Sequence, residues 1–362
     1  MPRGKAAVLN APREALSVDT VNVRDPRDGE VLVRLGASGV CHSDMHAITG
    51  DLPVPLPGVL GHEGAGTVEA IGAGVQRVRR GDHVVLSWVP FCGACWYCTS
   101  GHTHLCETGY VKAMGAQVFE RDGTIIGQFA GVGSMSEYTV VPENGCIAID
   151  ADVPLDCACL LGCGVMTGVG AVINTAEVKP GQSVAVFGAG GVGLNVVQGA
   201  ALAGANPIVA VDLNEKKLTL AKQFGATDTL IGGSNDPVNA ILELTGGRGV
   251  DVAFEVIGRP EVVLQAFMSV RRGGKVVVVG VPPVGAMVSI PAMLLPLTEK
   301  SLVGSLYGSA NMARDVPRLI DLYRSGKLKL DELITRRYTL AQVNDAFAAL
   351  EKGEVARGVI RF

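Results

Sequence analysis

The pattern of hydrophobic and polar positions changes part-way along the chain. Up to about residue 150, short apolar or alternating runs are separated by Gly and Pro, which is typical of β-strands joined by turns. Runs of this kind lie at 6–9, 30–35, 83–86 and 137–141. The first part of the chain is therefore expected to be rich in β-structure.

From Pro154 onward, apolar runs alternate with helical patterns. Five runs of strand length lie at 184–187, 208–212, 229–231, 250–256 and 275–280, and 301–306 could add a sixth. Helical patterns separate them, for example at 194–203 and 215–224. Strands that alternate with helices predict a parallel, doubly wound sheet. In the tail, Val343, Ala346, Phe347 and Leu350 share one helical face, and 357–362 reads as a final short strand.

Composition limits the class of protein. The chain has 362 residues, of which 48 % are apolar and 18 % charged, enough for two domains with full cores. A net charge of −4 argues against a nucleic acid or an acidic membrane as partner. No apolar run reaches the roughly 18 residues that span a bilayer, and the N-terminus leads into a strand rather than a signal peptide. A cytoplasmic protein is expected, and there clustered cysteines indicate metal rather than disulfides.

Four cysteines lie close together as Cys92-x-x-Cys95-x-x-Cys98-x7-Cys106. Closely spaced thiolates can enclose one tetrahedral Zn²⁺ and shield it from solvent, which makes a structural site. An iron–sulfur cluster or redox-active thiols are the alternatives, although the spacing matches neither the bacterial nor the plant-type cluster pattern. The spacing favours structural zinc.

A glycine-rich stretch follows the apolar run 184–187. Gly188, Gly190 and Gly193 form G-x-G-x-x-G at the start of a helix, and Asp212 ends the next strand 19 positions after Gly193. In this setting the motif predicts a dinucleotide site, with the pyrophosphate at the helix N-terminus. The carboxylate at Asp212 would bind the ribose hydroxyls and repel a 2′-phosphate, so NAD is favoured over NADP. A glycine-rich turn that binds nothing is the other interpretation.

Three further candidates are far apart in sequence. Cys41 lies 21 positions before His62, and Cys163 lies 101 positions after it. One His and two Cys can form the three-ligand site of a catalytic zinc with the fourth position open; this set is the one for which alcohol dehydrogenase is the known example.

Together these stretches resemble the zinc-containing alcohol dehydrogenases of the medium-chain dehydrogenase/reductase superfamily, over essentially the whole chain. The motifs that carry the resemblance are the stretches 39–44, 61–66, 162–164, 188–193, 254–259 and 279–283, and the four-Cys loop. The resemblance implies an α/β protein with a GroES-like, β-rich catalytic domain at 1–164. A Rossmann coenzyme domain with a doubly wound parallel sheet would occupy 165–306, and 307–362 would return to the catalytic domain.

The resemblance also implies roles for single residues. Cys41, His62 and Cys163 would bind the catalytic zinc, and the four-Cys loop a second, structural zinc, giving two Zn²⁺ per subunit. Ser43 would take the alcohol proton, His46 would pass it to solvent, Asp44 would orient His62, and Glu63 would approach the metal. The coenzyme would be held by His42, Thr167, Gly188, Gly190, Gly191, Val192, Gly193, Asp212, Lys217, Arg259, Val281 and Arg357. The substrate pocket would be lined by Trp88, Val111 and Phe129.

The activity implied is reversible hydride transfer between a primary alcohol or aldehyde and NAD, with zinc as the Lewis acid. A formaldehyde dehydrogenase that uses a mycothiol or glutathione adduct is the enzymatic alternative, because 160–166 looks like the mycothiol-dependent kind. A non-catalytic nucleotide-binding protein is the other, although such relatives typically lose the Cys41, His62 and Cys163 set. The long segment 110–140 is similar to the insert of dimeric members, so a homodimer is expected rather than a tetramer.

Overall fold

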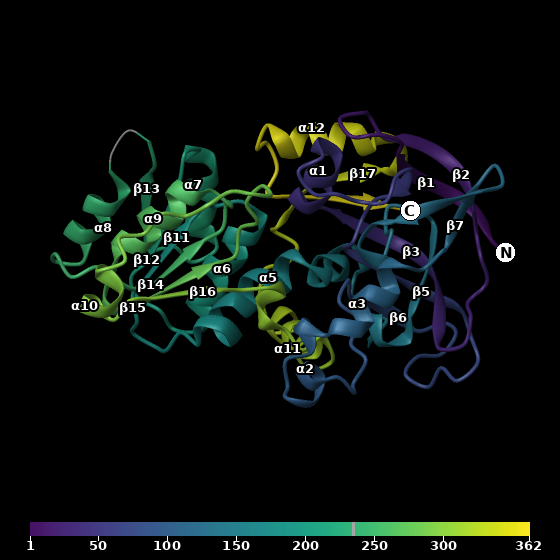
Figure 1. Cartoon of the computed structure of the whole chain (residues 1–362), viewed down its shortest axis with the longest axis horizontal. Coiled ribbons are helices and arrows are strands. Elements are labelled where there is room, and N and C mark those ends of the chain that lie inside the picture. The colour runs from purple at the N-terminus through teal and green to yellow at the C-terminus, as the bar shows by residue number, and fades with distance from the viewer. Residues whose placement is uncertain (234–235) are drawn as a thin grey trace. The chain divides into compact units, whose positions relative to one another are not determined.

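The computed structural model of the chain describes residues 1–233 and 236–362. The backbone forms two compact units (Figure 1). The first comprises Met1–Cys163 and Asn311–Phe362, and the second Gly164–Ala310. The domain boundaries expected from the sequence lie between residues 164 and 165 and between residues 306 and 307, close to these positions.

Two sheets build the first unit. A closed barrel runs in the order β1 (Arg3–Leu9), β2 (Ser17–Val23), β7 (Phe119–Arg121), β8 (Thr124–Gln128) and β4 (Gly58–Val59). The second sheet runs β10 (Cys146–Ile149), β6 (His83–Leu86), β5 (Gly64–Ile71), β3 (Glu30–Val40), β18 (Arg357–Arg361) and β17 (Ile334–Thr339), and β9 (Tyr138–Pro142) also pairs with β3. The helices of this unit are α1 (His42–Thr49), α2 (Trp96–Thr99), α3 (Glu107–Met114), α4 (Leu155–Ala158), α11 (Met312–Arg324) and α12 (Val343–Glu351).

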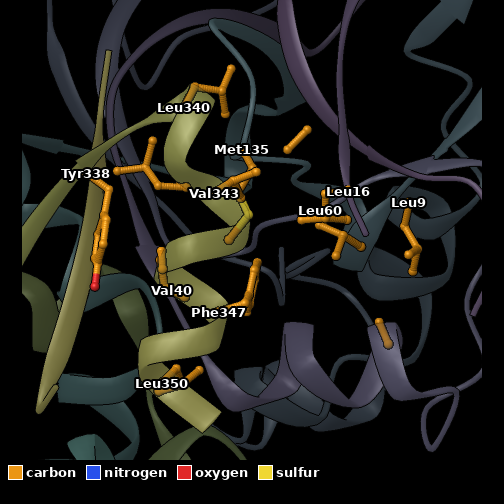
Figure 2. Packing of buried hydrophobic residues seen from close by; sticks show 14 of the residues in the cluster. Leu9, Leu16, Val40, Leu60, Met135, Tyr338, Leu340, Val343, Phe347 and Leu350 are labelled. Carbon is orange, nitrogen blue, oxygen red and sulfur yellow. The ribbon is translucent and has the colours of Figure 1, made fainter. Parts of the chain in front are cut away.

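The C-terminal strand ties the two ends of the first unit together. β18 pairs antiparallel with β3, so that Gly358 lies opposite Val40. The face of α12 that the sequence predicts to be apolar is buried, because Val343, Phe347 and Leu350 belong to one hydrophobic cluster with Val40 (Figure 2). Each such side chain stabilises the fold by about 1.5–3 kcal/mol when removed from water. This cluster also contains Leu60, two residues before His62, and Phe129, which packs against the His62 ring, and thereby supports the site described below.

The second unit is the doubly wound parallel sheet that the sequence predicts. Its strands run in the order β13 (Asp228–Ile231), β12 (Ile208–Asp212), β11 (Val184–Phe187), β14 (Val250–Glu255), β15 (Val270–Val278) and β16 (Ser301–Gly304). All neighbouring pairs are parallel. The helices are α5 (Gly164–Gly170), α6 (Gly191–Leu202), α7 (Glu215–Gln223), α8 (Pro237–Leu244), α9 (Pro260–Ser269) and α10 (Leu294–Thr298) (Figure 1). The strand order changes direction between β11 and β14, where ligands bind in sheets of this kind.

Among the described residues, no single helix is both long and apolar enough to cross a membrane. By length and composition only, one bent pair of helices, Leu155–Gly162 with Gly164–Ala176, meets the same criteria together.

Candidate active site and metal centres

The three dispersed ligand candidates meet in the first unit. Cys41 directly follows β3, His62 lies between β4 and β5, and Cys163 ends the first of the unit's two chain segments. The ligand atoms of these three residues and of Glu63 all lie within 4.8 Å of one another. All four residues are at least nine-tenths buried. A buried, sequence-distant group of two thiols, one imidazole and one carboxylate is a donor set suited to zinc.

The two ring nitrogens of His62 have different surroundings. Nδ1 lies 3.1 Å from Asp44 Oδ2, and Asp44 Oδ1 accepts a hydrogen bond of 2.8 Å from the Gly61 backbone N–H. Asp44 is fully buried, and its contact with Nδ1 holds the ring in one orientation. His62 Nε2 is buried and has no hydrogen-bond partner among the described residues. Histidines that bind a metal typically have this arrangement: a carboxylate contacts one ring nitrogen, and the other ring nitrogen faces the ion.

The ionisable groups of the site shift one another's pKa values. The adjacent Cys163 thiol, and after it His62, hold the pKa of the Cys41 thiol well below its ordinary value. Burial lowers the pKa of His62, but the carboxylate of Asp44 and then Cys41 outweigh it and raise that pKa well above its usual range. The thiolate is the form of cysteine that binds metal, so Cys41 is prepared to act as a ligand.

Glu63 has a partner that the sequence does not predict. Its buried carboxylate forms an ion pair with Arg357, whose side chain is only 4 % exposed. Arg357 is the first residue of β18, and this strand brings it beside β3 and the metal set. The family resemblance implies a coenzyme contact for Arg357, whereas within this unit its side chain pairs with Glu63.

The predicted proton-transfer residues lie on α1. Ser43 Oγ is 3.9 Å from Cys41 Sγ, so the hydroxyl is next to the metal set. His46 is one helical turn further along, and its side chain is 32 % exposed. Its Nδ1 lies 3.6 Å from Asp51 Oδ2, and the same oxygen accepts a 2.7 Å hydrogen bond from Thr49. Asp51, which no motif in the sequence indicates, extends this polar path toward solvent.

The three predicted pocket residues have different surroundings. Phe129 is buried and packs edge-on against the His62 ring, with centroids 5.5 Å apart. Trp88 packs edge-on against Tyr110 at 6.3 Å. Val111, the third predicted residue, is 67 % exposed. Helix α3 therefore turns Tyr110 toward Trp88 and Val111 away from the core. In a helix of only eight residues, the sequence pattern does not show which of these two neighbours faces inward.

The four-Cys loop forms a second metal-capable cluster. The sulfurs of Cys92, Cys95, Cys98 and Cys106 lie within 4.8 Å of one another. Cys92 Sγ is 3.9 Å from Cys98 Sγ, and Cys95 Sγ is 4.0 Å from Cys106 Sγ. Zinc–sulfur bonds of about 2.3 Å in a tetrahedron place the sulfurs roughly 3.8 Å apart, which these distances match. The Thr108 hydroxyl and backbone N–H groups lower the pKa of Cys92 to about 5, so this sulfur is prepared as a thiolate.

The glycine-rich stretch lies at the switch point of the second unit. Gly188 directly follows β11 with a φ of +103°, and Gly190 precedes the first turn of α6, which contains Gly191, Val192 and Gly193. A side chain at Gly193 would collide with the Gly188 carbonyl, so the close approach of strand and helix requires glycine here. Asp212 Oδ2 accepts a 2.8 Å hydrogen bond from the Ala189 N–H. The acidic residue and the glycine-rich loop are thus brought together.

The other predicted coenzyme residues are spread over both units. In the second unit, Thr167 lies on α5, Lys217 on α7, and Val281 follows β15 with 62 % exposure. Arg259 is also exposed and pairs with Glu261 at 2.5 Å. In the first unit, His42 is an exposed residue at the start of α1.

Comparison with known proteins identifies the family of the chain. Residues 27–151 match the alcohol dehydrogenase GroES-like domain, and residues 191–325 match the zinc-binding dehydrogenase domain. The chain is 40 % identical to an NDMA-dependent alcohol dehydrogenase of Amycolatopsis methanolica, over 98 % of each chain. The crystal structure of an alcohol dehydrogenase zinc-binding domain protein from Burkholderia ambifaria is 37 % identical, with a TM-score of 0.95, and covers 100 % of this chain and 99 % of its own. That of benzyl alcohol dehydrogenase from Acinetobacter calcoaceticus is 36 % identical, with a TM-score of 0.94, and covers 100 % of both chains. Two domain matches and this full-length likeness agree with the buried Cys41, His62 and Cys163 set, and the chain belongs to the zinc-containing alcohol dehydrogenases of the medium-chain dehydrogenase/reductase superfamily.

Proposed function

We propose that this enzyme interconverts a primary alcohol and its aldehyde by hydride transfer with NAD, and that it holds two zinc ions per subunit. The observation that carries the proposal is the buried set of Cys41, His62 and Cys163, with His62 Nε2 left for a metal. Zinc held there would supply Lewis acidity, which lowers the pKa of an alcohol hydroxyl toward neutrality. Cys92, Cys95, Cys98 and Cys106 would hold the second, structural ion.

The residues around this set transfer the proton, orient His62 and exclude water. Ser43 receives the alcohol proton next to Cys41, and His46 passes it toward solvent, with Asp51 beside its ring. Asp44 keeps His62 in its binding orientation. Phe129 covers one side of the His62 ring and helps to exclude water, which would compete with the hydride step.

The coenzyme is NAD in this proposal. Asp212 places its carboxylate at the glycine-rich loop, where it accepts from Ala189 N–H and Asn214 N–H. A negative charge at this place disfavours the 2′-phosphate of NADP. The pyrophosphate would lie at the N-terminus of α6.

A second candidate concerns the final hydride acceptor. The name of the relative from Amycolatopsis methanolica states that it depends on NDMA, and that protein is 40 % identical over 98 % of this chain. The second candidate is therefore an alcohol dehydrogenase that turns over with NDMA instead of with added NAD.

The pocket favours primary alcohols, including aromatic ones. Trp88 and Tyr110 form an edge-on aromatic pair, and such bulk leaves little room for a second substituent on the reacting carbon. The likeness to a benzyl alcohol dehydrogenase makes benzyl alcohol a suitable first substrate. An apolar pocket discriminates one methylene by only about 1–3 kcal/mol, so the preference should be graded.

We also propose a homodimer formed through the edge of the parallel sheet. β16 is the last strand in the sheet order, and its Leu302 is 38 % exposed. Between β15 and β16, Val284, Met287 and Met293 are 82 %, 86 % and 68 % exposed. An exposed strand edge beside an apolar surface is a feature that a second copy of the chain would cover.

One substrate and acceptor matrix tests the proposal. Benzyl alcohol, 1-propanol and 2-propanol are each supplied with NAD⁺, NADP⁺ or NDMA, and formaldehyde with and without mycothiol or glutathione. The proposal expects turnover of primary alcohols with NAD⁺. Turnover only with NDMA would favour the second candidate, thiol-dependent formaldehyde oxidation would favour the adduct-using class, and inactivity throughout with full zinc content would contradict both.

A further inference from the structure

A buried carboxylate ends the central strand of the second unit. Glu255 is the last residue of β14 and is 0 % exposed. Its Oε1 accepts hydrogen bonds from the backbone N–H groups of Ile257 at 2.9 Å, Gly258 at 2.7 Å and Arg259 at 3.4 Å. Burying a carboxyl group is costly unless it is hydrogen-bonded, so these three donors mark Glu255 as a residue with a specific task. The sequence places Glu255 within a family motif but assigns it no role.

The turn that Glu255 holds lies against the glycine-rich loop. β11 and β14 are neighbours, and Phe187 is in register with Glu255. A Cβ at Gly188, the first residue after β11, would come within 2.7 Å of the Ile257 side chain. Glu255 therefore fixes Ile257 through its N–H group, and Ile257 supports the start of the loop that receives the pyrophosphate.

The same turn also contacts the segment after β15. Gly258 has a φ of +86°, and a Cβ there would lie 2.5 Å from the Val281 carbonyl oxygen, so only glycine permits this contact. The backbone carbonyl of Glu255 accepts from Val279 N–H at 2.8 Å and Gly280 N–H at 3.1 Å. Side chain and backbone of one residue thus hold the loops that follow β14 and β15, next to the loop that follows β11.

We infer that Glu255 is a positioning residue for the dinucleotide, which sets coenzyme affinity by fixing these three loops without itself contacting the coenzyme. The inference rests on the proposed coenzyme function. In this fold class, neighbouring loops at the carboxyl edge of the parallel sheet form the ligand site. If Glu255 no longer holds these loops, the groups that bind the coenzyme are no longer fixed in their binding positions. A preorganised site binds more tightly because less order must be imposed on binding.

The chemistry of the side chain suggests a matched pair of variants. Glu255→Gln keeps an acceptor oxygen at nearly the same place, whereas Glu255→Leu removes it and leaves buried N–H groups without a partner. Burial raises the pKa of Glu255 despite the backbone donors, so a neutral amide is an acceptable substitute. Glu255→Asp is a third variant, whose shorter side chain withdraws the acceptor while keeping the carboxyl. Glu243→Gln on the exposed surface of α8 is the control.

The experiment measures NADH binding to the full-length protein by fluorescence titration, together with zinc content, melting temperature and the KM values for NAD⁺ and alcohol. We expect Glu255→Leu and Glu255→Asp to weaken NADH binding by about 10- to 100-fold. Zinc content and the KM for alcohol should stay near native values, since the metal ligands belong to the first unit. Glu255→Gln should restore affinity to within about threefold of the native value, as a retained acceptor predicts.

Three results would overturn the inference. Native-like NADH affinity in folded Glu255→Asp or Glu255→Leu is the first. Equal losses in Glu255→Gln and Glu255→Leu would be the second, because they would show that the acceptor oxygen is not what matters. A rise in the KM for alcohol equal to that for NAD⁺ would be the third, indicating general loosening. If the native protein binds no dinucleotide, the proposed function itself fails.

Discussion

The two metal-capable clusters of the first unit differ in how the chain assembles them. The four-Cys loop draws all its donors from residues 92–106, and only Cys106 among them is buried. The other set collects Cys41, His62 and Cys163 from three distant segments, and all are buried. The local loop thus brings its four thiols together without a ligand from a distant segment. The dispersed set forms only when the end of β3, the turn before β5 and the residue before α5 are all in place, so the fold must hold it.

This difference predicts opposite consequences of losing a ligand. A metal in the local loop would stabilise that loop, because three of its four cysteines are only partly buried and contribute little to a hydrophobic core. A metal in the dispersed set enters a site that the hydrophobic core already supports, including Phe129 beside His62. The first ion should matter mainly for stability, and the second mainly for chemistry.

The largest effect is expected for Cys163→Ala. This variant should lose one zinc and nearly all alcohol oxidation, far more than the roughly 10–100-fold cost of removing an outer partner of a metal ligand. It should still bind NADH, because the glycine-rich loop belongs to the other unit. Metal analysis, steady-state kinetics and NADH titration check this. Cys159→Ala, a buried thiol outside both clusters, is the control, and loss of NADH binding along with activity would count against the assignment.

Cys98→Ala should act mainly on stability. Three thiolates leave the local site open, and the loop loses the metal that orders it. We expect a melting temperature lower by more than about 5 °C, or aggregation, since each kcal/mol corresponds to a few degrees for a domain of this size. Differential scanning calorimetry with zinc analysis measures this effect. An unchanged melting temperature with two zinc ions still bound would show that the loop has no structural role.

Asp44→Asn tests the support of the dispersed set. The amide keeps the shape but removes the charge that faces His62 Nδ1, so zinc affinity or kcat/KM should fall about 10- to 100-fold. Competition with a zinc-binding dye gives the affinity. Asp25→Asn, an exposed carboxylate at the surface, should match the native enzyme. A native-like zinc affinity in Asp44→Asn would mean that packing alone orients His62.

Thr108→Val is the corresponding change at the local loop, and the smallest effect is expected here. The hydroxyl supports the low pKa of Cys92, but several backbone N–H groups do the same. Changes of this kind usually alter stability by about 0.5 kcal/mol or less, so the melting temperature should move by no more than about 2 °C. A loss as large as that of Cys98→Ala would show that the loop depends on its surroundings as strongly as the dispersed set does.

Sequence patterns predict the second unit well because its signals are local. The predicted strands at 184–187 and 208–212 coincide with β11 and β12, and the helix predicted at 215–224 with α7 to within one residue. β15 begins at Val270, five residues before the predicted start, because Gly273 and Gly274 interrupt the apolar pattern without ending the strand. Apolar periodicity and glycine spacing operate over a few residues and are visible in a single sequence.

The contacts that the sequence does not reveal are those between distant or exposed side chains. The ion pair of Glu63 with Arg357 joins residues 294 positions apart, through a strand whose partner no local pattern specifies. The approach of Asp51 to His46 follows the left-handed Gly50 that ends α1. Such pairings depend on how elements dock and turn, which composition and periodicity do not encode.

The dispersed set is expected to perform metal-dependent alcohol chemistry, and the four-Cys loop only to stabilise the fold. The most direct measurement is the zinc content per subunit of the native protein and of Cys163→Ala and Cys98→Ala, with benzyl alcohol oxidation assayed on the same samples. We expect two zinc ions in the native enzyme, and in Cys163→Ala one zinc, a native-like melting temperature and almost no turnover. Substantial turnover in Cys163→Ala after loss of its zinc would show that the dispersed set is not where the alcohol reacts.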